Sequence, residues 1–149
     1  MPPSGRRVSK RMTDRRDPIP FHPRFNLAIL RGEKTVTRRF RPRHVDTHLR
    51  AKNPIPGKRP NQWPGFADLV VTDCRSVRLH SITKEEARLE GFESVYEFEQ
   101  IWRELYPSSR PVNYYRQWER NPPVWRIEFR CLTHPARYVP LEAAPGVRE

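Results

Sequence analysis

The chain has 149 residues, of which 36% are hydrophobic and 17 are prolines. This length suits one domain, and the prolines predict a large share of irregular backbone. No apolar run reaches the length of about 18 residues that a membrane helix needs, and the start of the chain lacks an apolar segment, so we expect neither a membrane anchor nor a secretory signal.

The two cysteines, Cys74 and Cys131, lie far apart, each within an apolar-rich run. Such cysteines usually act as small buried hydrophobic residues in a reducing environment. We therefore expect a cytoplasmic protein without a disulfide.

The formal net charge is +12 and is distributed unevenly. Residues 1–50 hold 14 Lys/Arg against 4 Asp/Glu, whereas the rest of the chain holds 15 against 13. A one-sided positive charge is typical of proteins that bind a polyanion, most often nucleic acid. A solubilising tail is the alternative explanation, and charge alone does not separate the two.

In chain order, residues 1–19 predict a disordered basic arm, and Arg6, Arg7 and Arg11 are its candidates for contacts with RNA. The segment RFNLAILRG predicts a short helix that ends at Gly32 in a left-handed conformation. TVTRRF predicts a strand because it is rich in β-branched residues. Residues 41–65 contain five prolines and predict a long loop.

Residues 66–82 predict one bent strand or two successive strands. Thr83 with Glu86, and Ser94 with Glu97, have the spacing of capping boxes and predict two further helices. The first of these should stop at Glu90 and the second at Pro107. VWRIEFRCL alternates apolar and charged residues, which predicts a half-buried strand, its core face formed by Trp125, Ile127, Phe129 and Cys131. These elements favour a small α+β domain or a β-barrel with helical insertions.

Three stretches occur in an order that resembles an ASCH domain. They are the run Gly32-x-Lys34-x-x-Thr37-x-Arg39, the double-capped SITKEEARLEGFESVYEFEQIWRELYP, and the final IEFRCL. The resemblance covers roughly residues 20–133 and leaves the arm and an irregular C-terminal tail, 134–149, outside. It implies an α+β fold, a small PUA-like β-barrel with two or three short helices, and association with RNA.

Within that group the chain is similar to the small bacterial 4-N-acetylcytidine amidohydrolases. This similarity implies that Thr37 attacks an amide carbonyl, that Lys34 activates it, and that Glu90 assists proton transfer. The chain departs from the pattern in its arm, in the 41–65 loop and in the insert RPVNYYRQWERNPP. We expect these additions either to widen, to cover or to block a small-molecule pocket.

The residues themselves are chemically consistent with such a site. A lysine acts as a base only when its pKa is lowered, by loss of solvent or by neighbouring cations such as Arg38 and Arg39. Glu90 ends a helix, where the dipole favours its protonated form. Residues three apart on a regular strand face opposite ways, so Lys34 and Thr37 converge only if Lys34 precedes the strand or a bulge intervenes. The alternative is an ordinary solvated lysine and strand threonine.

Other patterns are less specific. Tyr114 and Tyr115, beside Arg116, have the side chains to stack bases and contact phosphates, or simply pack as loop aromatics. His44 and His48 have ligand-like spacing but lie in a Pro/Arg-rich loop, so we expect no metal and no cofactor.

Three functions remain open: an amidohydrolase, an RNA-binding module without catalysis, and a metal-independent ribonuclease. For all three the expected binding residues are Gly32, Arg38, Arg39, Tyr114, Tyr115, Arg116 and the arginines of the arm.

Overall fold

The structure is a computed structural model and describes residues 16–137. The expected contacts of Arg6, Arg7 and Arg11, and most of the C-terminal tail, lie outside this range. Within it, no helix combines the length and apolar composition that crossing a bilayer requires.

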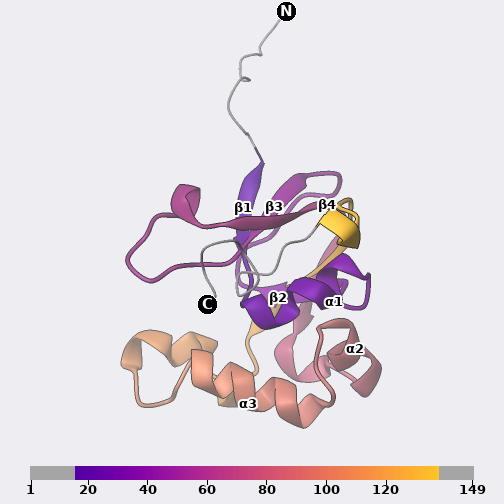
Figure 1. The fold of residues 1–149 in the computed structure, drawn as a ribbon. Coiled ribbons are helices and arrows are strands. Elements are labelled where there is room, and N and C mark those ends of the chain that lie inside the picture. Colours follow the sequence, from indigo (N-terminus) through magenta and orange to yellow (C-terminus); the bar gives the residue numbers. More distant parts are fainter. Residues whose placement is uncertain (1–15, 138–149) are drawn as a thin grey trace, which may run out of the picture.

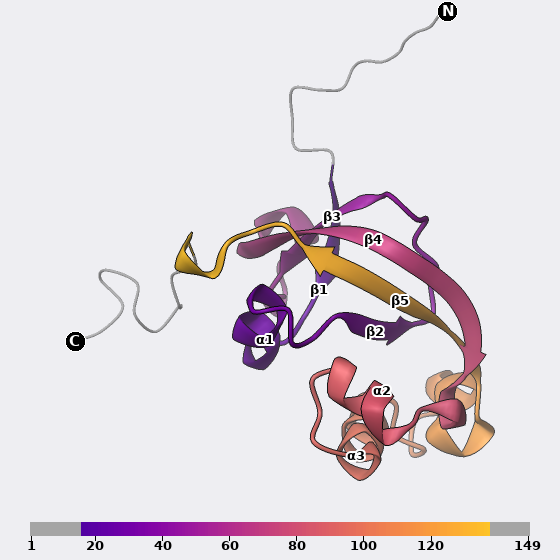
Figure 2. The same ribbon diagram turned by 90° about the vertical axis from the view of Figure 1, so that its right-hand side faces the viewer.

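A five-stranded mixed sheet forms the centre of the fold. Its strands are β1 (Asp17–Pro20), β2 (Val36–Arg39), β3 (His48–Lys52), β4 (Gly65–Arg78) and β5 (Pro123–Cys131). They lie in the order β1-β3-β4-β5-β2, with β1 and β3 parallel and the other pairs antiparallel. The long strands β4 and β5 curve strongly (Figure 2), and their register shifts between Val71 and Asp73. A bulge of this kind increases bending, and the sheet curls into a half-barrel.

Three α-helices and several short turns complete the domain. They are α1 (Asn26–Leu30), α2 (Lys84–Leu89) and α3 (Val95–Leu105). Figure 1 shows α1 close to the sheet, and α2 and α3 at the end where β2 lies. The 3-10 turns span Pro23–Phe25, Pro60–Gln62, Leu79–Ser81, Pro111–Arg116, Trp118–Arg120 and Pro135–Arg137. This α+β half-barrel is PUA-like, as the resemblance implied.

Two apolar clusters hold these layers together. One fills the curl of the sheet beneath α1 and includes Ile29, Leu69 and Ile127. The other joins α2 and α3 to the start of β5 and includes Phe98, Trp102 and Val124. Phe25 packs against both clusters. The boundary between them is therefore the place where a cavity can open without breaking either core.

The structure corrects the sequence prediction at two strands. The expected 41–65 loop contains β3, which pairs with β4 through residues such as Leu49 and Ala51, both fully buried. Strand β1 begins at Asp17, inside the expected arm, and pairs with β3 at the edge of the sheet. Its two prolines are tolerated there because an edge strand need not donate every backbone hydrogen bond.

Two charged side chains also differ from expectation. Arg126 was placed on the wet face of the last strand but is 95% buried, because carboxylates on α2 and β5 surround it. Thr83 accepts a hydrogen bond from the Glu86 backbone as a cap should, at 3.2 Å. The Glu86 side chain does not complete a capping box, since it is bonded to Arg38 and Arg126.

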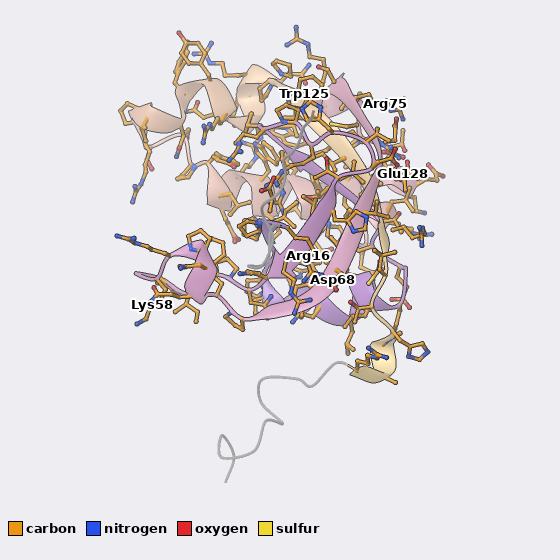
Figure 3. All side chains as sticks on the ribbon, turned by 90° about the horizontal axis from the view of Figure 1, so that it is seen from above. Arg16, Lys58, Asp68, Arg75, Trp125 and Glu128 are labelled. Carbon is orange, nitrogen blue, oxygen red and sulfur yellow. The ribbon has the colours of Figure 1, made fainter. Side chains whose placement is uncertain are left out.

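On the outer side of the sheet, Asp68 of β4 holds two arginines. Arg16 lies 2.5 Å from its carboxylate and Arg50 lies 2.9 Å away. Figure 3 shows Arg16 beside Asp68, so the residue before β1 is tied to a central strand. Cys74 and Cys131 are free and only partly buried, as their thiols sit at the margin of the core.

Candidate functional site

A cavity of about 800 Å³ opens between the two apolar clusters. Aromatic side chains from both clusters form its walls, and they include Phe21, Phe25, Phe92, Phe98 and Trp102. Lys34, Thr37, Arg38, Arg39 and Glu90 also line it. An apolar cavity with a few convergent polar groups is the usual form of a small-ligand site.

The backbone around Gly32 brings Lys34 to this cavity. Gly32 has φ +76°, the left-handed conformation expected of it, and the amides of Glu33 and Lys34 both donate to the Ala28 carbonyl in the middle of α1. Thr35 then donates to Leu89 at the end of α2 and accepts from Phe129 of β5. Lys34 therefore precedes β2, which is the irregular entry that convergence with Thr37 required.

Lys34 is 97% buried, and its amino group is enclosed by backbone carbonyls and one carboxylate. It donates to the backbone carbonyls of Val36 (2.9 Å) and Glu90 (2.5 Å), and it lies 3.6 Å from the Glu90 carboxylate. Burial lowers the pKa of Lys34 from 10.5 to about 8, with Glu90 opposing the shift and Arg39 and Arg38 adding to it. In mildly alkaline solution, Lys34 is therefore neutral in a sizeable fraction of the protein molecules.

Thr37 and Arg39 form the second part of the site. The Thr37 hydroxyl accepts a hydrogen bond from Arg39 Nε at 2.8 Å, so its own proton is free for another acceptor. Arg39 Nη2 donates to the Pro20 carbonyl, and its guanidinium lies over the Phe21 ring. Burial lowers the pKa of Arg39 from 12.5 to about 10, so the group keeps its charge at neutral pH.

Glu90 is the C-cap of α2, as its position before Gly91 predicted, and is 97% buried. Arg38 donates to the Glu90 carboxylate at 2.9 Å and to Glu86 at the same distance. Arg126 holds Glu86 through two further hydrogen bonds. This chain of alternating charges anchors Glu90 to β2 and β5, so its carboxylate cannot turn away from the cavity.

The structure thus brings Lys34, Thr37, Arg39 and Glu90 to one cavity, together with Arg38. Lys34 and Thr37 share no hydrogen bond among the described residues. Tyr114, Tyr115 and Arg116 lie elsewhere, on the turn after α3: Tyr115 is 81% exposed, and Arg116 covers the rings of Phe40 and Tyr106. Gly32 shapes the backbone but does not line the cavity.

Sequence reasoning missed two groups of residues at this site. The aromatic walls come from segments 20–25 and 92–106, which the sequence analysis gave no role in a site. The two phenylalanines within PFHPRF, Phe21 and Phe25, were the available indication of an aromatic wall. The pairing of Glu86 with Arg38 and Arg126 joins residues 40 or more positions apart, and nothing in their local spacing points to it.

Neither a protein-family model nor a curated protein matches the chain. Solved structures do resemble it. A protein of Enterococcus faecalis V583, described under the family model DUF984, has TM-score 0.59 at 14% identity, over 81% of this chain and 82% of that one. An ASCH domain from Lactobacillus crispatus JV V101 has TM-score 0.56 at 16% identity, over 73% and 70%. The chain has the ASCH-domain fold.

A further ASCH structure, a point mutant of the protein from Zymomonas mobilis, has TM-score 0.52 at 15% identity and covers 89% of this chain and 88% of that one. Identities this low establish the ASCH fold and leave the chemistry to be argued from the site. In residues 16–137 no cluster of three or more His, Cys, Asp or Glu is arranged to hold a metal ion.

Proposed function

We propose that this ASCH-fold protein binds a modified nucleoside, or a nucleotide of RNA, in the cavity and hydrolyses an acyl amide on a cytosine-type base. The observation that carries the proposal is a cavity with aromatic walls, reached by a buried lysine, a hydroxyl and a carboxylate. Aromatic rings stack on bases, and the polar groups supply the parts of an acyl-transfer site.

The reaction starts from neutral Lys34. The carbonyls of Val36 and Glu90 accept its two N–H groups, which leaves the nitrogen lone pair to take a proton. As the Thr37 oxygen attacks the amide carbonyl carbon, its proton passes to Lys34. Arg39, bonded to the Thr37 oxygen, favours the developing negative charge on that oxygen.

Collapse of the tetrahedral intermediate breaks the carbon–nitrogen bond. The exocyclic nitrogen of the base leaves with a proton from Lys34, and the acyl group stays on Thr37 as an ester. Water then attacks the ester, giving a carboxylic acid and the free hydroxyl. Glu90, 3.6 Å from the lysine nitrogen, accepts or returns the proton that Lys34 carries.

The test is incubation of the full chain with free 4-N-acetylcytidine, with deacetylation followed by chromatography. We expect turnover that is lost in Thr37→Val and Lys34→Met and kept in Thr35→Val. Thr35 is a suitable control because its hydroxyl lies two residues away and does not line the cavity.

A folded protein that binds cytidine without turnover would instead be the binding module, and the amidohydrolase would be rejected. Metal-free shortening of RNA that depends on Lys34 and Thr37 would identify the ribonuclease.

A further inference from the structure

The cavity has more positive than negative side chains. Arg24, Lys34, Arg38 and Arg39 line it, against the carboxylates of Glu90 and Glu104. Glu104 is exposed on α3, and Arg24 is matched by Glu97 at 3.4 Å. The imbalance therefore lies in the inner part of the cavity, where Lys34, Arg38 and Arg39 line the wall beside the single carboxylate of Glu90.

The nearby carboxylates are already engaged. Glu86 is held by Arg38 and Arg126, while Glu90 is held by Arg38 and faces Lys34. Between residues 16 and 137, no carboxylate lies within 4.0 Å of Arg39. The Arg39 side chain is partly buried, and a charge withdrawn from water with no carboxylate in contact costs free energy unless a ligand supplies one.

The guanidinium of Arg39 is nevertheless held firmly. Nε donates to Thr37 Oγ1, Nη2 donates to the Pro20 carbonyl, and Cζ lies 4.8 Å from the centre of the Phe21 ring. These contacts use two of its three nitrogens and leave Nη1 without a partner in the described chain. Arg38 Nε, beside it on β2, is buried and has no hydrogen-bond partner in the described residues.

We infer that the ligand carries a phosphate group, and that Arg39 binds it from the cavity. A guanidinium suits this role because its planar array of N–H donors matches phosphate oxygens. The phosphate is either the monoester of a free nucleotide or a diester of an RNA chain. The inference rests on the proposed nucleoside site and makes it selective for the phosphorylated form.

The test compares three probes by calorimetry: cytidine, cytidine 5′-monophosphate, and a cytidine-centred trinucleotide without terminal phosphates. None carries an acyl group, so turnover does not interfere. We expect at least one phosphorylated probe to bind about tenfold or more tightly than cytidine, as expected for hydrogen bonds between charged groups. Preference for the monophosphate identifies a free nucleotide, and preference for the trinucleotide identifies RNA.

Arg39→Gln should abolish this advantage, so that the phosphorylated probes bind it no more tightly than cytidine does. Arg41→Gln removes the same charge from an exposed position outside the cavity and should keep the advantage. Equal binding of all three probes would overturn the inference and leave the nucleoside site standing. An advantage that Arg39→Gln retains would also overturn it. Absence of binding by every probe would reject the nucleoside site and the inference with it.

Discussion

Lys34 places an ionisable amino group at a position that is almost inaccessible to solvent. Three charged neighbours act on it: Glu90 from the end of α2, and Arg38 and Arg39 from β2. Loss of solvent is the largest influence and is opposed by Glu90, which is why the pKa falls only to about 8. The protonated form is thus disfavoured in the folded protein relative to the unfolded chain.

This difference predicts a pH effect on stability. Since the pKa of Lys34 is about 8 when folded and 10.5 when unfolded, the unfolded chain binds more protons between those values, and stability rises with pH there. From pH 7 to about pH 9, the free energy of unfolding of the wild type should gain about 1 kcal/mol relative to Lys34→Met. Urea unfolding of both proteins at each pH measures this. A difference that stays constant with pH would mean that the folded pKa is not lowered.

Two glycines in the segments that follow α1 and α2 share a positive φ but differ in how closely other atoms approach them. Gly32 and Gly91 both have positive φ, +76° and +95°. A Cβ at Gly32 would meet no atom within 4 Å, whereas one at Gly91 would lie 2.9 Å from the Phe25 ring and 3.3 Å from Lys34 Cδ. The chain passes so closely at Gly91 because α2 ends there against the cavity.

Gly32→Ala should therefore cost only the backbone strain, about 1 kcal/mol of unfolding free energy. Gly91→Ala should cost about 2 to 4 kcal/mol, because overpacking against an aromatic ring is added to the strain. It should also weaken nucleoside binding, since Phe25 and Lys34 both line the cavity. Chemical denaturation and calorimetry check the two effects, and equal costs for both variants would contradict the packing explanation.

Glu86 is one of the side chains that attach helix α2 to the sheet, through Arg38 of β2 and Arg126 of β5. Hydrogen bonds from Arg126 and Arg38 lower the pKa of Glu86 from 4.5 to about 2, although partial burial opposes the shift. The stabilisation from this group is complete above its unfolded pKa and is lost as the pH falls toward about 2.

Glu86→Gln leaves two arginines short of a counter-charge and should lower the free energy of unfolding by at least about 2 kcal/mol at pH 7. The gap between wild type and variant should close as the pH falls from about 5 toward 2. Glu85→Gln, on an exposed position of the same turn, is the control and should change little. A gap that persists at low pH would show that charge is not the cause.

The elements that the sequence predicted well are those with a strong local pattern. The caps Thr83 and Ser94, the stop at Gly32 and the apolar alternation of the last strand each reflect a short-range rule. Strands β1 and β3 were missed because DPIP and HLRAK are short and lie in proline-rich segments, and only their partners in the sheet make them strands. Arg126 was assigned to the wrong environment because its carboxylate comes from a distant helix.

The candidate site was found through a motif rather than through periodicity. Its four residues do line one cavity, and their roles in binding and catalysis stay predictions. Three features of the site depend on how the two apolar clusters meet. They are the aromatic walls, the position of Arg38 between two carboxylates, and the absence of a carboxylate beside Arg39 in the described residues. Such features follow from the assembled fold and have no counterpart in local spacing.

At the scale of the whole molecule, charge predicts how RNA would bind. Residues 1–15 hold five Lys/Arg against one Asp. Phosphate contacts release counterions, so deleting 1–15 should weaken RNA binding and reduce the slope of log affinity against log salt by up to about 4. Titration of a short RNA at several salt concentrations measures this. Deacetylation of the free nucleoside should survive the deletion, and an unchanged salt slope would exclude the arm from RNA contact.

The position of β5 has a consequence for how the protein is made. Every residue that lines the cavity has been synthesised by Tyr106, yet β2 lies at the edge of the sheet and pairs with β5, which begins only at Pro123. A nascent chain therefore contains every lining residue of the site before it contains β5, the strand that pairs with β2. Translation that stops between these points would release a polypeptide with a complete set of site residues and no site.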